Sequence, residues 1–289
     1  MFVRLDISQE TADRKAWEDL LAASGLRPDP PYSAVYGIYE EGRLAATGAR
    51  DRSRLKCVAV DPAYRGSSLF SRLLTGIIAE AFDADINKLF LYTRPEAAAS
   101  FSRVGFRTLA VTPQGITFME RGRPSLSEYL DRLAREQPAQ DPFEAVLADT
   151  VQDTATSRKL LAGALSRPSR SYVFYRDDPA ALDEGACPWL EAFPQILCHD
   201  SQGYLIPLAD FPAYFLPDEK ERVRAQAWLE ASLLGDRIAP ALGIKRLTLG
   251  LDRRDPLQVI YLDTVRQVLD SRLDLTVIPL DEGDGVLIS

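Results

Sequence analysis

The sequence contains very little cysteine and histidine. Its three cysteines, Cys57, Cys187 and Cys198, have no regular spacing, and His199 is the single histidine among 289 residues. Three irregularly spaced cysteines predict neither a disulfide framework nor a zinc site, which is typical of a protein of the reducing cytosol. One histidine excludes every mechanism that needs two. We therefore expect no metal site and a cytoplasmic location.

Long apolar runs are also missing. No stretch approaches the roughly 18 to 20 apolar residues of a membrane-spanning helix, and Met1 to Asp6 lack the basic-then-apolar layout of a secretory signal. Hydrophobic residues make up 46% of the chain and charged residues 26%, a mixture that excludes disorder and fibrous repeats. The sequence predicts a soluble globular protein with no membrane partner.

Positive charge is scarce overall and unevenly placed. Lysine and arginine number 34 against 42 acids, a net charge of −8. Residues 1–123 carry 17 basic and 15 acidic residues, a net charge of +2, and the remainder carries 17 and 27, a net charge of −10. Sequence-independent binding of nucleic acid depends on neutralised phosphates, so an acidic chain predicts no nucleic-acid partner. The asymmetry indicates two units with different partners.

The apolar periodicity weakens between Arg121 and Pro142, where glycine and prolines bracket one short amphipathic helix. This pattern indicates a linker helix within residues 124–142, between domains at 1–123 and 143–289. In the first domain we expect strands at Val35–Tyr39, Leu44–Arg50, Leu55–Val60, Lys88–Tyr92 and near Ile116–Met119. We expect helices at Thr11–Ser24, after the turn that ends at Ser68, and, as a short helix, between the last two strands.

After the linker, short apolar strands alternate with helical segments. Such alternation predicts an α/β domain with a parallel sheet flanked by helices. The expected strands are Ala145–Ala148, Tyr172–Tyr175, Gln195–Cys198, Arg246–Leu249 and Leu275–Ile278.

A turn of small residues is the most informative feature of the first domain. A strand ends at Asp61-Pro62, the turn Arg65-Gly66-Ser67-Ser68 follows, and an amphipathic helix begins. Such a turn leaves free backbone N–H groups at the positive end of the helix dipole, which suits a pyrophosphate. Gly66 and the serines allow close approach of the backbone, and Arg65 adds charge. The alternative is an ordinary strand–turn–helix connection.

The segment from Cys57 to Leu74 resembles the acyl-CoA-binding motif of the GNAT acyltransferases, whose loop reads Gln/Arg-x-x-Gly-x-Gly/Ala. Gly66 is kept, Ala63 stands at the first position and Ser68 replaces the last small residue. The resemblance implies a mixed GNAT sheet with helices that binds acetyl-CoA or another acyl-CoA. The residues expected to contact this cofactor are Val58, Val60, Arg65, Gly66, Ser67, Ser68 and Leu69.

The catalytic groups of that family are harder to identify. The segment Phe101–Phe106 resembles the Tyr-x-x-x-Gly-Phe signature, and Phe101 stands where many GNAT enzymes have the tyrosine that protonates the departing thiolate. Tyr92 lies nearby in sequence, as a catalytic candidate or as a core residue of its strand. No Asp, Glu or His is evidently placed as the general base for an amine acceptor. Binding of CoA is therefore better supported than acyl transfer.

Across both domains the chain resembles the citrate lyase ligase family, which joins a GNAT domain to a nucleotidyltransferase-like domain. That family uses ATP and acetate to make acetyl-adenylate and then acetylates the thiol of the prosthetic group on citrate lyase's acyl-carrier subunit. The resemblance implies a Rossmann-like second domain and a partner of acyl-carrier or citrate-lyase type. It rests on five blocks in the same order, namely Leu55–Val60, Phe90–Pro95, Cys198–Tyr204, Ala209–Phe215 and Ile238–Ile244.

The second domain departs from the family's ATP motifs. Where the family reads Asn-Pro-Phe-Thr-x-Gly-His, this chain places Thr156 on the glycine and Ser157 on the histidine. Ser157 is then a catalytic remnant or a helix cap, and His199 is a catalyst or a local hydrogen-bond partner. The family's Ile-Ser-x-Ser-x-x-Arg motif is expected to be cut short at Ser289, and its Gly-x-Glu-Pro loop is altered within Gly250–Pro256. We expect a degenerate domain that does not use ATP.

Three functions follow from this reading. The first is acyl transfer by the GNAT domain, with the second domain as a docking surface for an acyl-carrier or partner protein. The second is a genuine ATP-dependent, AMP-forming ligase that acetylates the citrate lyase prosthetic group. The third is a non-catalytic pseudoenzyme that regulates or scaffolds a complex. The resemblance by itself implies ancestry and leaves all three open.

Overall fold

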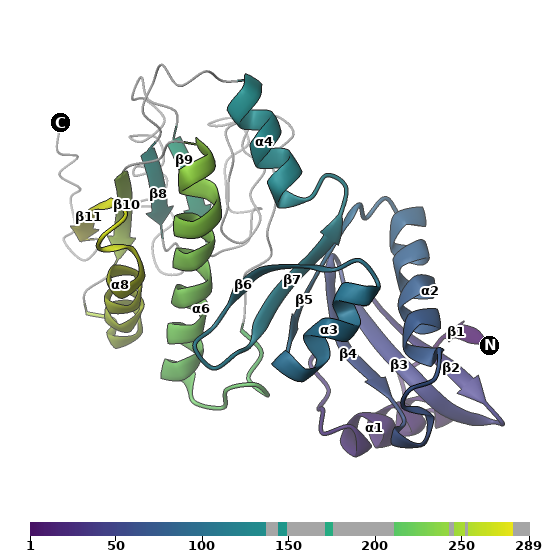
Figure 1. Cartoon of the computed structure of the whole chain (residues 1–289). Helices are drawn as coiled ribbons and strands as arrows, with labels where there is room; N and C mark the ends of the chain where they lie inside the picture. Colours follow the sequence, from purple (N-terminus) through teal and green to yellow (C-terminus); the bar gives the residue numbers. More distant parts are fainter. Residues whose placement is uncertain (137–143, 149–170, 176–210, 243–245, 252–253, 280–289) are drawn as a thin grey trace. The chain divides into compact units, whose positions relative to one another are not determined.

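The computed structural model describes residues 1–136, 144–148, 171–175, 211–242, 246–251 and 254–279 (Figure 1). The chain divides into two compact units, Met1–Arg123 and Pro124–Ser289. The first unit is described throughout, whereas the second is described in part.

The first unit is built on a seven-stranded mixed sheet. The strand order is β1-β2-β3-β4-β5-β7-β6, and only the central pair, β4 with β5, runs parallel. The mixed sheet expected for this part of the chain is confirmed. The strands are β1 (Phe2–Arg4), β2 (Ala34–Glu40), β3 (Arg43–Asp51), β4 (Arg54–Val60), β5 (Lys88–Thr93), β6 (Arg107–Val111) and β7 (Thr117–Gly122).

Helices cover both faces of this sheet. Helix α1 (Ala12–Ala23) packs on one face around Trp17 and Leu21. Helices α2 (Leu69–Asp83) and α3 (Pro95–Arg103) pack on the other face, where an apolar residue recurs on α2 at every turn and is buried. The carboxyl ends of β4 and β5 both lead into this second layer, through a short 3-10 turn (Pro62–Tyr64) before α2 and directly into α3.

The described strands of the second unit form a four-stranded parallel sheet in the order β11-β10-β8-β9. This arrangement confirms the parallel sheet that the strand–helix alternation predicts. The strands are β8 (Glu144–Ala148), β9 (Ser171–Tyr175), β10 (Arg246–Leu251) and β11 (Asp274–Pro279). The expected strand at Gln195–Cys198 lies outside the described residues.

Two helices of the second unit pack together, α6 (Glu219–Leu233) and α8 (Pro256–Leu269). Between them Glu230 is only 3% exposed, and it accepts hydrogen bonds from the Tyr261 hydroxyl and from Gln226 Nε2. A π-helical turn (Leu234–Ile238) joins α6 to α7 (Ala239–Leu242), and α7 contacts α4 (Leu126–Glu136). The helix expected between the two domains is therefore α4, which lies in the second unit.

The expected elements of the first unit are all present, with ends that differ by one or two residues for most of them. The sequence pattern misses β1 and β6. Strand β1 has three residues, and β6 is an edge strand of five with two buried residues, Leu109 and Ala110. Elements this short present too few buried positions for a period to be recognised.

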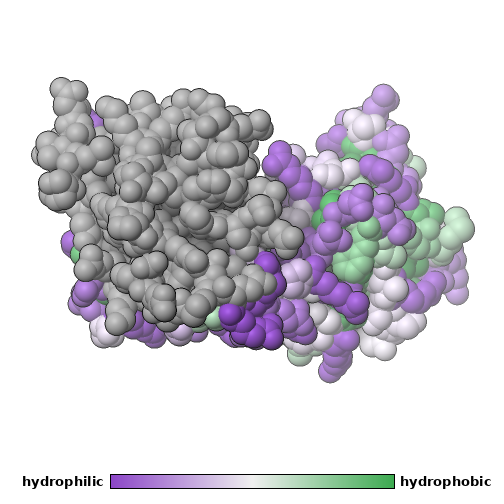
Figure 2. Space-filling view, turned by 90° about the horizontal axis from the view of Figure 1, so that it is seen from above, coloured by the Kyte–Doolittle hydropathy of each residue, from purple (hydrophilic) through white to green (hydrophobic). Residues whose placement is uncertain are grey.

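The described surface mixes hydrophilic and hydrophobic side chains, and in Figure 2 a hydrophobic area is visible among hydrophilic side chains over the first unit. Among the helices that the structure describes, none has the length and apolar character needed to cross a bilayer.

Candidate functional site

The turn before α2 is an exposed segment that contains a glycine with positive φ. Asp61 Oδ1 accepts the backbone N–H of Ala63 at 2.8 Å, which begins a 3-10 turn. Gly66 has φ of +84°, and a side chain built there would meet no atom within 4 Å. Arg65, Gly66, Ser67 and Ser68 are exposed. The glycine is thus needed for its positive φ, and open space faces it.

The first turn of α2 offers free backbone donors at this place. Ser68 is the N-cap, and its side chain makes no capping hydrogen bond. The N–H of Leu69 donates to Ser67 Oγ at 3.3 Å. The next two donors, the N–H groups of Phe70 and Ser71, have no backbone acceptor within the first unit, and the Arg72 N–H begins the helical pattern by donating to Ser68 O at 2.9 Å. Leu69 itself is 3% exposed and anchors the helix end in the core. The arrangement fits an anion held by backbone N–H groups.

Strands β4 and β5 share a single register pair, Arg54 with Phe90. Beyond it β4 continues for six residues to Val60, and β5 continues to Thr93, where it pairs with β7 on its other side. Two parallel strands that no longer pair leave a fork in the sheet, with β4 backbone groups along one side. Val58 and Val60 lie at this edge with their side chains partly buried against the α2 layer.

A bulge interrupts β4 at the beginning of the fork. The β3–β4 register passes from Thr47↔Ala59 to Ala49↔Lys56, so Gly48 faces two residues, Cys57 and Val58. Cys57 has φ of +53°. Because of the extra residue, side chains no longer alternate between faces: Cys57 belongs to the α1 layer and Val58 to the α2 layer.

Lys56 also lies on the α1 side, beside the loop that follows α1. Its side chain is 4% exposed, and Nζ lies 3.8 Å from Asp29 Oδ2 and 5.3 Å from the centre of the Tyr32 ring. Burial lowers the pKa of the Lys56 ammonium, whereas Asp29 opposes that shift. Burial likewise raises the pKa of the Cys57 thiol to about 11, which makes Cys57 a poor nucleophile at neutral pH.

Phe101 and Tyr92, the aromatic residues considered for catalysis, are both buried. Phe101 is 6% exposed, with its ring edge-on to Phe70 at 5.2 Å between centroids and to Phe106 at 5.8 Å. Tyr92 is 8% exposed, and its ring lies 4.9 Å from that of Phe118 and under the Arg54 guanidinium. Phe101 belongs to the α2 layer, and Tyr92 is packed among aromatic rings of β5 and β7. The geometry favours the core role for Tyr92.

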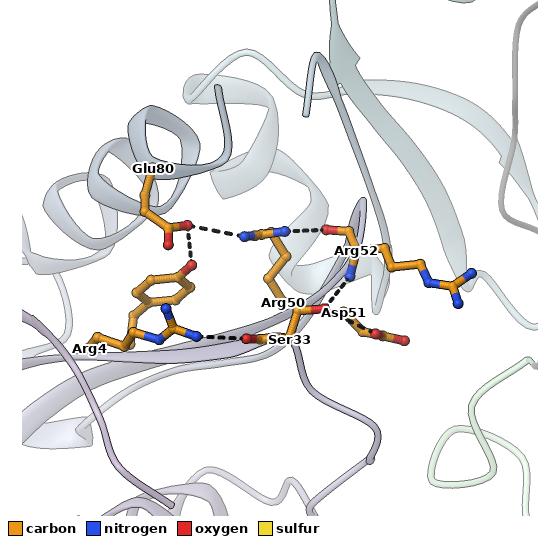
Figure 3. Close-up of polar contacts among 7 residues, drawn as sticks. Arg4, Ser33, Arg50, Asp51, Arg52 and Glu80 are labelled. Atoms are coloured by element: carbon orange, nitrogen blue, oxygen red, sulfur yellow. Dashed lines mark hydrogen bonds and ion pairs between the residues drawn. The ribbon is translucent and has the colours of Figure 1, made fainter. Parts of the chain in front are cut away.

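A polar network fixes α2 to the sheet below it (Figure 3). The Glu80 carboxylate accepts hydrogen bonds from the Tyr36 hydroxyl and, at 3.2 Å, from Arg50 Nη2. Arg50 Nη1 donates to the backbone oxygen of Arg52 at 2.7 Å. Tyr36 is 1% exposed, and burial raises its pKa to about 12, with the hydrogen bond to Glu80 as the next cause. This network holds the end of α2 farthest from the turn at Gly66.

The candidates in the second unit, Ser157 and His199, lie outside the described residues, as does Thr156. The strand order nevertheless contains a reversal, because β9 and β10 lie on opposite sides of β8. In open parallel sheets, ligands bind beyond the carboxyl ends of the strands at such a reversal. Here those ends are Ala148 of β8 and Leu251 of β10.

Sequence reasoning located the turn at Arg65–Ser68 and the strand beside it. It missed the contact between Lys56 and Asp29, because the two residues are 27 positions apart and no motif contains them. It also missed the bulge at Cys57. The one available signal was Lys56 itself, a charged residue inside an otherwise apolar strand, Leu55–Val60.

Family models match both parts of the chain. Residues 4–106 match the acetyltransferase (GNAT) family, and residues 172–289 match the citrate lyase ligase C-terminal domain. The [citrate [pro-3S]-lyase] ligase of Klebsiella pneumoniae is 28% identical over 248 residues, which cover 82% of this chain and 71% of the relative. The protein of the same name from Escherichia coli K12 is 24% identical and covers 80% of this chain and 68% of the relative.

Solved structures are similar to part of the chain. A GNAT-family acetyltransferase from Staphylococcus aureus Mu50 matches with 16% identity and a TM-score of 0.36, covering 42% of this chain and 98% of that one. A putative acetyltransferase from Salmonella typhimurium, solved with acetyl-CoA, matches with 18% identity and a TM-score of 0.35, covering 43% and 94%. Taken together, the chain is similar to the citrate lyase ligases over about four fifths of its length, and it matches the acetyltransferase (GNAT) family in its first part and the citrate lyase ligase C-terminal domain in its second.

Proposed function

We propose that the first unit binds acyl-CoA and transfers its acyl group, and that this is the function of the domain. The observation that carries the proposal is the combination of the fork between β4 and β5 with the exposed Gly66 turn at the start of α2. The turn supplies N–H donors for a pyrophosphate, and the fork supplies unpaired backbone groups for an amide-containing arm. Val58, Val60, Arg65, Gly66, Ser67, Ser68 and Leu69 are the residues assigned to this cofactor.

The fork between β4 and β5 and the turn at Gly66 follow one another in the order of the parts of CoA that they would bind. Strand β4 runs from the fork at Arg54 towards Val60, and the turn at Gly66 follows within six residues. An extended pantetheine arm bound along β4 therefore places its diphosphate at the turn and its thioester near the bulge at Cys57. The acidic charge of the diphosphate meets the positive end of α2 and the exposed guanidinium of Arg65.

The test is a thermal melt of the full chain with and without acetyl-CoA, CoA and ATP. A ligand that binds only the folded state stabilises it by RT ln(1 + [L]/Kd), about 2.7 kcal/mol at a hundredfold excess over Kd. The proposal expects a rise in Tm with acetyl-CoA and with CoA. A Tm that is unchanged by either compound at millimolar concentration rules out the proposal.

For the second unit we propose a docking role towards an acyl-carrier or citrate-lyase-like partner without adenylation activity. The support is sequence: Ser157 and Thr156 occupy the positions that the family resemblance gives to histidine and glycine. The names of the relatives favour the other candidate, an ATP-dependent ligase that forms AMP. Acetate-dependent exchange of pyrophosphate into ATP separates the two, since only the ligase supports it.

A further inference from the structure

The bulge in β4 places two successive side chains, Lys56 and Cys57, on the same face of the sheet. Both lie against the loop between α1 and β2, which contains Asp29 and Tyr32. A regular strand would have turned one of the two side chains towards α2. The bulge therefore brings a lysine ammonium into a layer that otherwise consists mainly of apolar side chains, including Trp17, Leu21 and Val35.

The two charges of this cluster are not joined by a hydrogen bond, and one oxygen of the Asp29 carboxylate lacks the donor that a buried charge normally has. The distance of 3.8 Å between Lys56 Nζ and Asp29 Oδ2 exceeds that of a hydrogen bond. Asp29 Oδ2 is buried and accepts no hydrogen bond from the residues of the first unit. Burying charged groups without such bonds is costly, and sites that show it are often functional. A molecule that donates to Asp29 and accepts from Lys56 would complete both groups.

The cluster lies at the level of β4 where the proposed cofactor ends. Lys56 is two residues beyond Arg54, the last β4 residue that pairs with β5. At about 3.3 Å per residue, Lys56 lies roughly 13 Å along β4 from Val60, near the turn that would hold the diphosphate. The thioester of a CoA bound along β4 then comes to the base of the fork, level with Lys56, whose ammonium lies on the α1 side of the sheet beside Asp29. Solvent reaches part of the Asp29 side chain, which is 24% exposed, although its Oδ2 atom is buried.

We propose that Asp29 and Lys56 form a proton-relay pair for acyl transfer in the first unit, an inference that rests on the proposed binding of acyl-CoA. The acceptor, an amine or hydroxyl compound, attacks the thioester carbonyl carbon. A new bond to that carbon forms, its bond to sulfur breaks, and the acceptor's proton passes to the Asp29 carboxylate. The Lys56 ammonium gives a proton to the departing CoA thiolate. Asp29 then returns the acceptor's proton to Lys56, and both groups are restored.

The surroundings of Lys56 suit this role. Burial lowers the pKa of its ammonium towards that of a thiol, so a proton passes from it to a thiolate more readily than from an exposed lysine. The relay also supplies the two groups that the sequence lacks at familiar positions, a base for the acceptor and a proton donor in place of Phe101. The charged or titratable groups near Lys56 are Asp29, Asp51, Arg54, Tyr32 and Cys57.

The experiment measures CoA release from acetyl-CoA by the full chain, with panels of amines and alcohols, for the variants Asp29→Asn, Lys56→Met, Lys56→Arg and the double variant Asp29→Asn/Lys56→Met. The matched controls are Asp19→Asn and Lys15→Met, two exposed residues of α1. The Tm shift with CoA is recorded for each variant, so that cofactor binding is followed apart from turnover.

We expect each single variant to lower kcat by about 10²- to 10⁴-fold, with the CoA-induced Tm shift retained and the controls unchanged. Lys56→Arg should be as slow as Lys56→Met, because a guanidinium keeps the charge but does not give up its proton. The double variant leaves no unpaired buried charge. It should fold well and remain as slow as the single variants, because one relay is removed in each case.

Several results would overturn the inference. Turnover within threefold of wild type in Asp29→Asn or Lys56→Met would show that the proposed relay does not operate. High activity in Lys56→Arg would show the same. Recovery of activity in the double variant means that the pair is only structural. Turnover in wild type with unaffected variants leaves the proposed acyl transfer intact. CoA binding without turnover refutes both relay and transfer, and absence of CoA binding refutes the proposed function itself.

Discussion

The ring of Phe101 meets the ring of Phe70 edge to face, with centroids 5.2 Å apart. Phe70 stands in the first turn of α2, one residue beyond Leu69, and Phe101 belongs to α3. The contact therefore links the proposed diphosphate site to the position at which, by the family resemblance, many GNAT acyltransferases have a tyrosine. Phe101 has no hydroxyl to donate, so slow amine acetylation is expected unless another group provides the proton.

Phe101→Tyr should restore part of the acyl transfer that Lys56→Met removes. Phe101 belongs to the α2 layer, whereas Lys56 lies on the α1 side of the sheet, so we expect the new hydroxyl to protonate the leaving thiolate from the opposite face. We expect at least a tenfold higher kcat for Phe101→Tyr/Lys56→Met than for Lys56→Met, within the range typical of a general acid. Steady-state rates with acetyl-CoA and the best acceptor measure it. The conservative control is Phe106→Tyr, which adds a hydroxyl to the neighbouring ring; equal rescue by both changes would contradict the assignment of position 101.

Gly66→Glu should abolish the Tm shift caused by CoA. The residue has φ of +84° and sits in the exposed turn, so a side chain there is strained and a carboxylate repels the diphosphate. We expect at least a tenfold higher Kd, measured by calorimetric titration. Gly25→Glu is the matched control, because Gly25 has φ of +69°, faces open space as well, and ends α1. An equal loss of CoA affinity in both variants would point to general destabilisation.

Much of the first unit could be predicted from its sequence, because its long elements have clear periods. The α2 stripe of Leu69, Leu73, Ile77 and Ala81 repeats every four residues and is buried. The turn before α2 was also predictable, because a cluster of glycine and serines between a strand and a helix marks a turn. These are local features, in which the residues that act together are adjacent in sequence.

The contacts of Lys56 could not be predicted in this way. They depend on a bulge that shifts the face of one residue, and on a loop whose position is decided by the packing of α1. An alternating pattern assigns Lys56 and Cys57 to opposite faces, whereas the structure has both beside Asp29 or its neighbours. The network of Arg50 with Glu80 was likewise hidden, because it joins β3 to α2 across 30 residues. Such pairs are products of tertiary packing rather than of local pattern.

The first unit should lose stability as the pH rises from about 10 to 12. Tyr36 donates a hydrogen bond to Glu80, is 1% exposed, and has a pKa raised to about 12 from its ordinary value of 10. A raised pKa in the folded state means that the unfolded chain loses its proton first. The stabilising contribution is therefore complete below pH 10 and disappears as the pH passes 12. Two units of pKa correspond to about 3 kcal/mol.

Urea unfolding at pH 8, 10 and 12 checks this expectation, with Tyr36→Phe as the test variant. The variant should be less stable by about 1 kcal/mol at pH 8, because the hydrogen bond to Glu80 is gone, and its stability should fall less than that of wild type between pH 10 and 12. Tyr39 also has a pKa raised to about 12. The variant Tyr39→Phe therefore measures separately how much this second tyrosine contributes to the alkaline loss of stability. Parallel curves for wild type and Tyr36→Phe would show that Tyr36 does not contribute to the alkaline loss.

The last prediction concerns ATP. We expect no acetate-dependent exchange of pyrophosphate into ATP by this chain, because adenylation requires groups that stabilise the charge developing on the α-phosphate. Ser157 carries no charge where the family resemblance has a histidine, and Thr156 adds a side chain where a glycine leaves room for phosphate. Losing one preorganised donor of this kind typically costs about 3 to 4 kcal/mol in rate, which reduces exchange by roughly two to three orders of magnitude.

The matched variants are Ser157→His and Thr156→Gly, made singly and together in the full chain. If the missing groups alone limit adenylation, the double variant should show more exchange than either single variant, because the family resemblance implies that both the histidine and the space left by the glycine are needed. Binding of acetyl-CoA to the first unit, measured by the Tm shift, should be the same in all of these variants. Exchange well above background in the unchanged chain would refute the docking role and favour the ligase, since no mechanism without adenylation incorporates pyrophosphate into ATP in an acetate-dependent manner.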